Sequence, residues 1–223
     1  MAELKFCGLT RPDDAALAAE LGARYLGVIF AGGPRTLDPE RAAAVLDAAS
    51  GARRPARVGV FGAASPAEVA DAAARARLDV VQLHADPDAR QVAGVRERFG
   101  GRVWAVIRTA GAELPAGAAD LFRVADAVVL DARSPGSLGG TGIPLDWSAL
   151  APVVDRLRGR TPLVLAGGLT DANVERAVRA MSPDVVDVSS GVERAPGIKD
   201  PARMRAFAAA AMAGAHDVVP THH

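Results

Sequence analysis

Two residues that could exchange protons with a substrate stand at the ends of apolar, strand-like runs. Cys7 closes the run at 4–7, and Asp131 follows the run at 127–130. A carboxyl group can act as a general acid, and a thiol can act as a general base once a nearby cation favours its thiolate. Lys5 is such a cation, because alternation places it on the inner face with Cys7. The alternatives are an inert buried thiol and a carboxylate that caps the next segment.

Small residues follow two other short β-branched runs, at 163–166 and 185–188. The two turns contain Gly167, Gly168, Ser190 and Gly191. Backbone N–H groups in such turns, next to helix N-termini, can surround an anion, and TIM barrels place a phosphate after their last two strands. Either turn alone would be read as an ordinary tight turn. Because both stand at matching strand ends, the sequence predicts a phosphate site there.

Further candidate residues lie at or after the ends of other predicted strands. Arg35 follows a proline in a stiff loop, where it could bind a substrate carboxylate in a bidentate manner, although a solvated loop charge is the usual fate of Arg. His84 ends the fourth run and is expected beside the substrate as a supporting group. Gly140 and Thr141 belong to a glycine-rich loop that suits a lid over a ligand.

A regular alternation of strands and helices must position these residues. Strand-like runs lie at 4–7, 25–30, 57–61, 80–83, 103–107, 127–130, 163–166 and 185–188. Ala-rich amphipathic segments separate most of them, and the helix at 111–124 is the weakest prediction because Pro115 and Gly117 interrupt it. The connections between neighbouring strands are not suited to tight hairpins, which join antiparallel strands. The strands should therefore be parallel.

These units predict an α/β protein with a single closed (β/α)8 TIM barrel over residues 1–213, and a doubly wound open sheet is the alternative. Residues 214–223 show no periodicity and are expected to be a C-terminal tail. In a barrel the C-terminal strand ends share one rim, so Cys7 and Asp131 would stand on different sides of a ligand. Closure would also bring Asp187 beside Lys5, and we predict an ion pair between them.

Composition excludes several classes of protein. Lys plus Arg number 26 and Asp plus Glu number 26, so no net field attracts nucleic acid or an acidic membrane, and neither is predicted as a partner. A single cysteine excludes an intramolecular disulfide and a cysteine-rich metal site, which fits a reducing compartment. The chain opens with no charged-then-apolar leader and has no apolar run of the ~20 residues that span a membrane. We expect a cytoplasmic protein.

Short motifs along the chain occur in an order typical of one known family. They are KFCGLT at 5–10, GVIF with PR at 34–35, VGVF at 58–61, VQLH at 81–84, LD at 130–131, GGTG followed by DW at 146–147, AGGL with NV at 173–174, and VDVSSGVE with PGIKD at 196–200. Together they resemble phosphoribosylanthranilate isomerase. The match runs from the first strand to the last helix, so it is far more specific than any single glycine turn.

The resemblance implies a cofactor-free Amadori rearrangement in tryptophan biosynthesis, from N-(5-phosphoribosyl)anthranilate to 1-(2-carboxyphenylamino)-1-deoxyribulose 5-phosphate. By the same resemblance, Asp131 would protonate the ribose ring oxygen, and Cys7 would remove a proton from the carbon beside the former anomeric centre. Arg35 would hold the anthranilate carboxylate, and the loops after strands six, seven and eight would bind the phosphate. The expected protein is a monomer or a homodimer that acts on a small-molecule substrate without a metal.

Two positions depart from the family's pattern, which usually has Ser before the Pro-Arg pair and Gly after the strand-four His. Gly33 and Ala85 stand there, and we expect a modest effect on affinity. Two other functions are alternatives. A related sugar isomerase of histidine synthesis would be expected to use two Asp residues, so Cys7 speaks against it. A non-catalytic phosphate-ligand binding barrel would need neither Cys7 nor Asp131.

Overall fold

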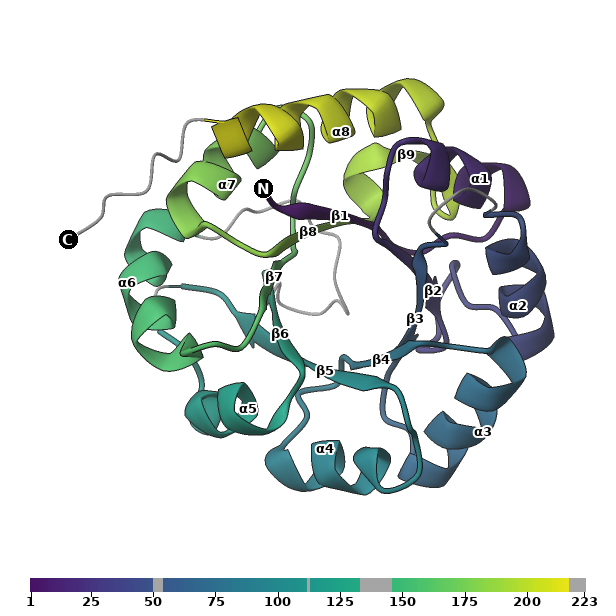
Figure 1. The fold of residues 1–223 in the computed structure, drawn as a ribbon, viewed down its shortest axis with the longest axis horizontal. Helices are drawn as coiled ribbons and strands as arrows, with labels where there is room; N and C mark the ends of the chain where they lie inside the picture. Colours follow the sequence, from purple (N-terminus) through teal and green to yellow (C-terminus); the bar gives the residue numbers. More distant parts are fainter. Residues whose placement is uncertain (50–53, 112, 133–145, 217–223) are drawn as a thin grey trace.

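Parallel strands close into a ring, and helices surround it (Figure 1). The computed structural model describes residues 1–49, 54–111, 113–132 and 146–216, and every element named below lies in those ranges. The ring strands are β1 (Glu3–Phe6), β2 (Tyr25–Ile29), β3 (Ala56–Phe61), β4 (Val80–Leu83), β5 (Arg102–Thr109), β6 (Ala127–Ala132), β7 (Leu163–Leu165) and β8 (Val185–Val188). They follow one another around the ring in chain order, so the predicted (β/α)8 barrel is confirmed.

The outer layer consists of helices that return the chain from one strand to the next. They are α1 (Pro12–Glu20), α2 (Pro39–Asp47), α3 (Pro66–Ala76), α4 (Ala89–Arg96), α5 (Ala118–Val124), α6 (Trp147–Arg158), α7 (Val174–Met181) and α8 (Pro201–His216). Between β8 and α8 lie a short 3-10 helix, η1 (Ser190–Val192), and two short strands, β9 (Glu193–Ala195) and β10 (Ile198–Lys199).

Polar side chains cap the N-termini of three of the helices. The side chain of Asp38 accepts a hydrogen bond from the N–H of Arg41 at the start of α2. Ser65 and Glu68 form a reciprocal capping box at α3. Asp200 accepts from the N–H groups of the second and third residues of α8. Each cap satisfies backbone donors that the helix itself leaves unpaired.

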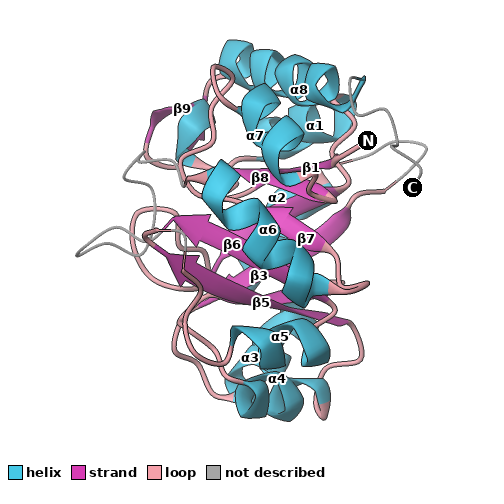
Figure 2. Ribbon diagram, turned by 90° about the vertical axis from the view of Figure 1, so that its left-hand side faces the viewer, coloured by secondary structure: helices cyan, strands magenta, loops and turns pink. Residues whose placement is uncertain are grey.

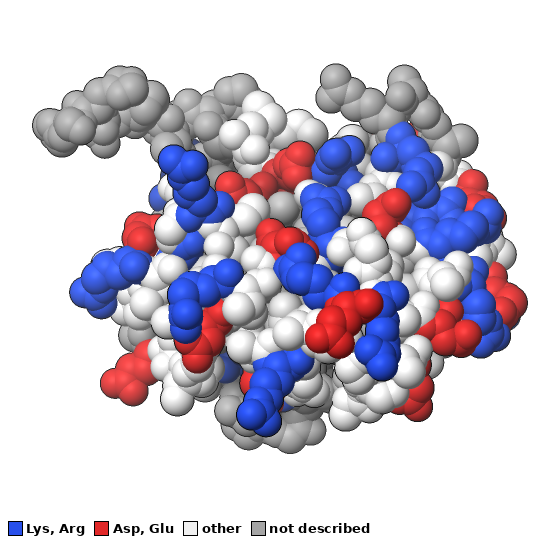
Figure 3. Space-filling view, turned by 60° about the horizontal axis from the view of Figure 1, so that its bottom comes forward, with Lys and Arg blue, Asp and Glu red and all other residues white. Residues whose placement is uncertain are grey.

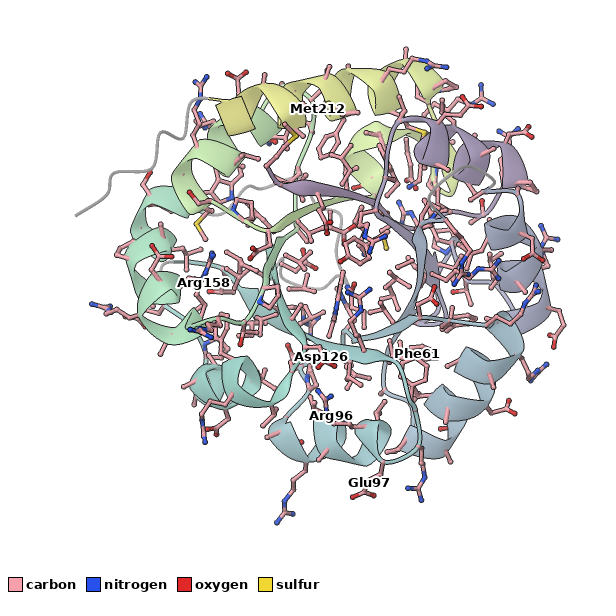
Figure 4. The ribbon with its side chains drawn as sticks, viewed as in Figure 1. Phe61, Arg96, Glu97, Asp126, Arg158 and Met212 are labelled. Carbon is pink, nitrogen blue, oxygen red and sulfur yellow. The ribbon has the colours of Figure 1, made fainter. Side chains whose placement is uncertain are left out.

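Side chains alternate between the barrel interior and the helix layer. Along β1, Leu4 and Phe6 pack among the apolar residues between strands and helices. Lys5 and Cys7 take the other face, as alternation predicts. Phe61 on β3 points outward to the helices (Figure 4). The alternation therefore decides which strand-end residues can reach the centre of the ring.

The ring closes where β1 pairs with β8. The register sets Lys5 opposite Asp187. Lys5 Nζ donates to Asp187 Oδ2 over 2.6 Å, and both side chains are buried. The ion pair predicted from closure of the barrel is confirmed, and it lies at the seam between the first and last strands.

Three segments differ from the sequence expectation. β9 and β10 form an antiparallel hairpin that periodicity did not reveal, because each strand has only two or three residues. α8 continues to His216, so the boundary expected at 213 falls inside a helix, where Gly214 is buried against α7. Residues 217–223 of the expected tail lie outside the described ranges. The weakly predicted fifth helix begins only after Gly117.

The β9 strand and the start of the chain lie at opposite rims of the barrel (Figure 2). Figure 2 shows β9 on the side toward which the strand arrows point, and the N-terminus on the other side. Positive and negative side chains intermingle on the face seen in Figure 3. One ion pair of opposite charges, Arg96 on α4 with Asp126 before β6, spans 3.0 Å (Figure 4). Within the described ranges, no helix has the length and apolar character needed to cross a membrane.

Removing the charge of Lys5 should strongly destabilise the barrel. Lys5→Met leaves Asp187 buried without its partner, and losing one member of a buried ion pair costs about 3–5 kcal/mol. Arg75→Met breaks an exposed pair with Glu40 and should cost less than about 1 kcal/mol. Urea unfolding followed by circular dichroism measures both variants. A loss for Lys5→Met as small as that for Arg75→Met would contradict the structural role of the seam pair.

Candidate active site

One cavity at the C-terminal rim gathers the predicted site residues. Its volume is about 420 Å³. Its wall includes Cys7, Arg35, His84, Asp131, Gly167, Gly168, Ser190 and Gly191. Gly140 and Thr141, predicted for a loop over the ligand, lie outside the described residues. Every predicted site residue that the structure describes therefore borders the same space.

Cys7 follows β1 at the rim. Its N–H donates to the carbonyl of Val188 over 2.9 Å, which holds this strand end against β8. On the neighbouring strand, a Cβ at Gly27 would come within 2.8 Å of the Cys7 sulfur. Only glycine leaves room for the thiol at this point. Sequence reasoning missed Gly27, because a glycine inside an apolar run gives no sign of what it approaches.

Burial raises the pKa of the Cys7 thiol, because the thiolate would lose its hydration. The positive charge of Lys5 opposes this shift, and the negative charge of Asp187 adds to it. Lys5 does favour the thiolate, but its charge is paired with Asp187 and does not outweigh burial.

Asp131 extends from β6 into the cavity. Burial, together with the negative charge of Asp187, raises the pKa of this carboxyl to about 6, and the positive charges of Arg108 and Lys5 limit the rise. His84 Nε2 lies 3.5 Å from Asp131 Oδ2, so the histidine borders the carboxyl as well as the cavity. A carboxyl with this pKa keeps its proton more often than an ordinary Asp, as a general acid requires.

The turn after β7 is shaped to make room for Asp131. Gly167 has a φ of +81°, and a Cβ there would come within 2.6 Å of Asp131 Oδ1. Asn173 holds the turn from the other side, since it accepts from the N–H of Thr170 over 2.8 Å and donates to the carbonyl of Gly168 over 2.9 Å. The N–H groups of Gly167 and Gly168 reach no backbone acceptor among the described residues, so they are available to an anion.

The helix N-termini expected next to both glycine turns differ from the prediction. After β7, α7 begins only at Val174, several residues beyond Gly168. After β8, Ser190 and Gly191 begin the 3-10 turn η1 and not an α-helix. The two turns nevertheless border the same part of the cavity wall. Anion binding there would rest on the turn amides more than on helix dipoles.

Arg35 meets a carboxylate that belongs to the chain itself. Its Nε donates to Glu193 Oε1 over 2.8 Å, and its Nη2 donates to Glu193 Oε2 over 2.6 Å. Lys199 Nζ donates to the same Oε1 over 3.0 Å and to the carbonyl of Cys7 over 2.6 Å. Sequence reasoning gave Glu193 and Lys199 no role. Their only signal was membership of the motifs VDVSSGVE and PGIKD.

The residues that line the cavity could act on a substrate that carries two negatively charged groups. A carboxyl whose pKa is raised to about 6 and a thiol both border the cavity, and each could move one proton. Arg35 suits a carboxylate, and the glycine turns suit a phosphate. Within the described ranges, no three His, Cys, Asp or Glu side chains are grouped to hold a metal ion.

Comparison with known proteins identifies the family. A sequence model of N-(5'-phosphoribosyl)anthranilate (PRA) isomerase matches residues 4–210. The N-(5'-phosphoribosyl)anthranilate isomerase of Paramagnetospirillum magneticum is 40% identical over 219 residues, which cover 95% of this chain and 98% of that protein. The enzyme of the same name from Geotalea uraniireducens is 42% identical over 210 residues, with 93% and 97% covered.

Solved structures agree with the sequence comparison. The crystal structure of phosphoribosyl anthranilate isomerase from Thermotoga maritima has a TM-score of 0.84 at 32% identity, covering 95% of this chain and 99% of that one. A phosphoribosyl anthranilate isomerase in complex with reduced 1-(o-carboxyphenylamino)-1-deoxyribulose 5-phosphate has a TM-score of 0.81 at 31% identity, with the same coverage. The chain therefore belongs to the N-(5'-phosphoribosyl)anthranilate isomerase family.

Proposed function

We propose that this chain catalyses the cofactor-free Amadori rearrangement of N-(5'-phosphoribosyl)anthranilate, with Asp131 as general acid and Cys7 as general base. Its family assigns the chain to isomerases of tryptophan biosynthesis. The observation that carries the residue roles is that both groups border one cavity of about 420 Å³ together with Arg35 and the glycine turns. A related isomerase binds a reduced form of the product, a molecule with one carboxylate, one sugar chain and one phosphate.

In this proposal, Arg35 and the amides of the glycine turns determine how the substrate is oriented. The anthranilate carboxylate would lie against Arg35, whose guanidinium can donate two parallel hydrogen bonds. The phosphate would accept hydrogen bonds from the amides of Gly167, Gly168, Ser190 and Gly191. The ribose between them would then lie beside the acid and the base. Gly140 and Thr141 would belong to the loop that covers the phosphate end, as the resemblance implies.

The reaction opens the ribose ring and then moves a hydrogen from C2 to C1. Asp131 gives its proton to the ring oxygen as the bond from C1 to that oxygen breaks, and the nitrogen lone pair forms an iminium ion. Cys7 thiolate then takes the proton from C2, and the electrons of that C–H bond neutralise the iminium to give an enolamine. The Cys7 thiol returns its proton to C1, and the C2 hydroxyl loses a proton that restores the one Asp131 gave, so the enolamine becomes the amino-ketone. No atom is gained or lost, so the step is an isomerisation.

We also propose that the protein is a monomer or a homodimer and that it is located in the cytoplasm. We keep monomer and homodimer as the two candidates, since one related isomerase from Thermotoga maritima is dimeric in its native form. The single cysteine and balanced charge support a cytoplasmic location. Analytical ultracentrifugation at several protein concentrations would distinguish the two assemblies.

The decisive assay uses the purified chain without metal or nucleotide. N-(5'-phosphoribosyl)anthranilate contains the fluorescent anthranilate group, so its conversion can be followed as a loss of fluorescence. Turnover under these conditions supports the proposal. A chain that binds the product analogue but never turns the substrate over would instead be a phosphate-ligand binding barrel.

Replacing the acid should stop the chemistry and spare binding. In Asp131→Asn the side chain keeps its shape but has no acidic proton, and general acid catalysis contributes about 10²–10⁴-fold. We expect kcat to fall by at least about 100-fold, while titration calorimetry shows the reduced product analogue bound within about threefold of the native affinity. Native-like turnover in this variant would rule out Asp131 as the acid.

Replacing the base should be equally severe. Cys7→Ser fits the same space, but a hydroxyl is a far weaker acid than a thiol and supplies almost no anion to accept the C2 proton. We expect kcat to fall by at least about 100-fold with the urea midpoint nearly unchanged. Exchange of the C2 hydrogen for deuterium provides a second measurement, because it should be lost in this variant. Retained kcat and retained exchange would show that another group removes the proton.

The raised pKa of Asp131 should also appear in the stability of the protein. Its pKa is about 6 in the fold against an ordinary 3.8. The fold thus binds this proton more tightly than the unfolded chain does, so the carboxyl's contribution is fully present below pH ~4 and is lost as pH rises through about 6. The loss reaches about 3 kcal/mol at ~1.4 kcal/mol per pH unit. Relative to the native chain, Asp131→Asn should therefore gain up to this amount in urea unfolding between pH 4 and pH 7. A pH-independent difference between the two proteins would contradict the pKa.

A further inference from the structure

The guanidinium of Arg35 is held along one edge only. Nε and Nη2 donate to the two oxygens of Glu193 over 2.8 and 2.6 Å. Nη1 donates to no acceptor among the described residues, although Arg35 borders the cavity. A planar guanidinium offers its N–H groups along more than one edge. The edge formed by Nη1 and Nη2 can therefore receive a second carboxylate while Glu193 keeps the first.

Two other donors, from Lys199 and Gly197, also hold the side chain of Glu193 in place. Its side chain is only 5% exposed, and Lys199 Nζ donates to its Oε1 over 3.0 Å. The N–H of Gly197 reaches the same oxygen over 3.3 Å. Lys199 is fully buried and also binds the carbonyl of Cys7 over 2.6 Å. Glu193 is thus a fixed carboxylate in the hairpin between β8 and α8.

A fixed partner changes what Arg35 contributes to binding. A free arginine side chain has about 2 kcal/mol of rotamer entropy to lose when it binds a ligand. Here the pair with Glu193 has already ordered the guanidinium, whose side chain is 23% exposed at the cavity. Glu193 shares its negative charge between Arg35 and Lys199, so it does not cancel the charge of the guanidinium. A substrate carboxylate therefore meets a cation whose orientation is already set.

We propose that Glu193 is a positioning residue for the isomerase reaction: it orders Arg35 so that the Nη1–Nη2 edge receives the substrate carboxylate. The proposal rests on the role proposed above for Arg35. Glu193 does not touch the substrate and acts on its carboxylate through Arg35, while Lys199 keeps its own bond to the carbonyl of Cys7. It should therefore affect carboxylate recognition and leave the phosphate end and the proton transfers unchanged.

The test is Glu193→Gln, which keeps the size of the side chain but loses one acceptor and the charge. KM for N-(5'-phosphoribosyl)anthranilate should rise about tenfold, the size of one lost charge-assisted hydrogen bond, while kcat stays within about threefold. The affinity for inorganic phosphate, measured by calorimetry, should stay within about twofold. Glu40→Gln is the matched control, because Arg75 binds Glu40 along the same edge at 2.8 and 2.9 Å on the outer surface. It should change neither constant.

A double variant separates positioning from general loosening of the fold. In an Arg35→Met background, adding Glu193→Gln should change KM by less than about twofold, because the residue through which Glu193 acts is gone. If Arg35→Met alone leaves KM unchanged, the proposed role of Arg35 fails. If Arg35→Met raises KM but Glu193→Gln does not, only the positioning role fails. A parallel loss of phosphate affinity in Glu193→Gln would likewise overturn it, since that loss would indicate a structural effect.

Discussion

The barrel is organised around a charge that water does not reach, the ammonium group of Lys5 at the seam of β1 and β8. An isolated buried ammonium would be very costly, so a carboxylate must stand beside it. Asp187 fills that requirement only in one register, because a slip of one residue would set Lys5 opposite Val186 or Val188. The pair therefore specifies where the first and last strands meet. It also fixes the height of Cys7 relative to the turn that follows β8.

The same pair sets the electrostatics of the cavity. Burial raises the pKa of both Cys7 and Asp131, Asp187 adds to both shifts, and Lys5 opposes both. Because the pair is neutral as a unit, burial prevails at each site. A raised pKa suits the acid and handicaps the base. In the proposed mechanism the order of steps compensates, since the iminium ion formed by the acid step acidifies the C2 proton. A thiolate present in a small fraction can then remove it.

Local sequence patterns predicted most of the fold because local chemistry determines it. Period-two runs located all the ring strands, and closure of the barrel alone paired Lys5 with Asp187. The strand-end rule also brought the candidate site residues of the described ranges to one cavity. The net pKa of Cys7 could not be predicted, because it sums burial and charges from several strands. The close approach of Gly27 to its sulfur is equally non-local.

The sequence pattern did not predict the hairpin of β9 and β10, because that hairpin also depends on contacts between distant segments. Its strands are too short to alternate, and their value lies in contacts across the seam: Thr10 Oγ1 donates to the carbonyl of Gly197, and the N–H of Lys199 donates to Asp14. Arg35 comes from the second unit and its partner Glu193 from the eighth. An open sheet with the same strands would keep these two units apart. The pair of Arg35 and Glu193 therefore depends on a closed ring, so this part of the cavity wall and the barrel are specified by the same seam.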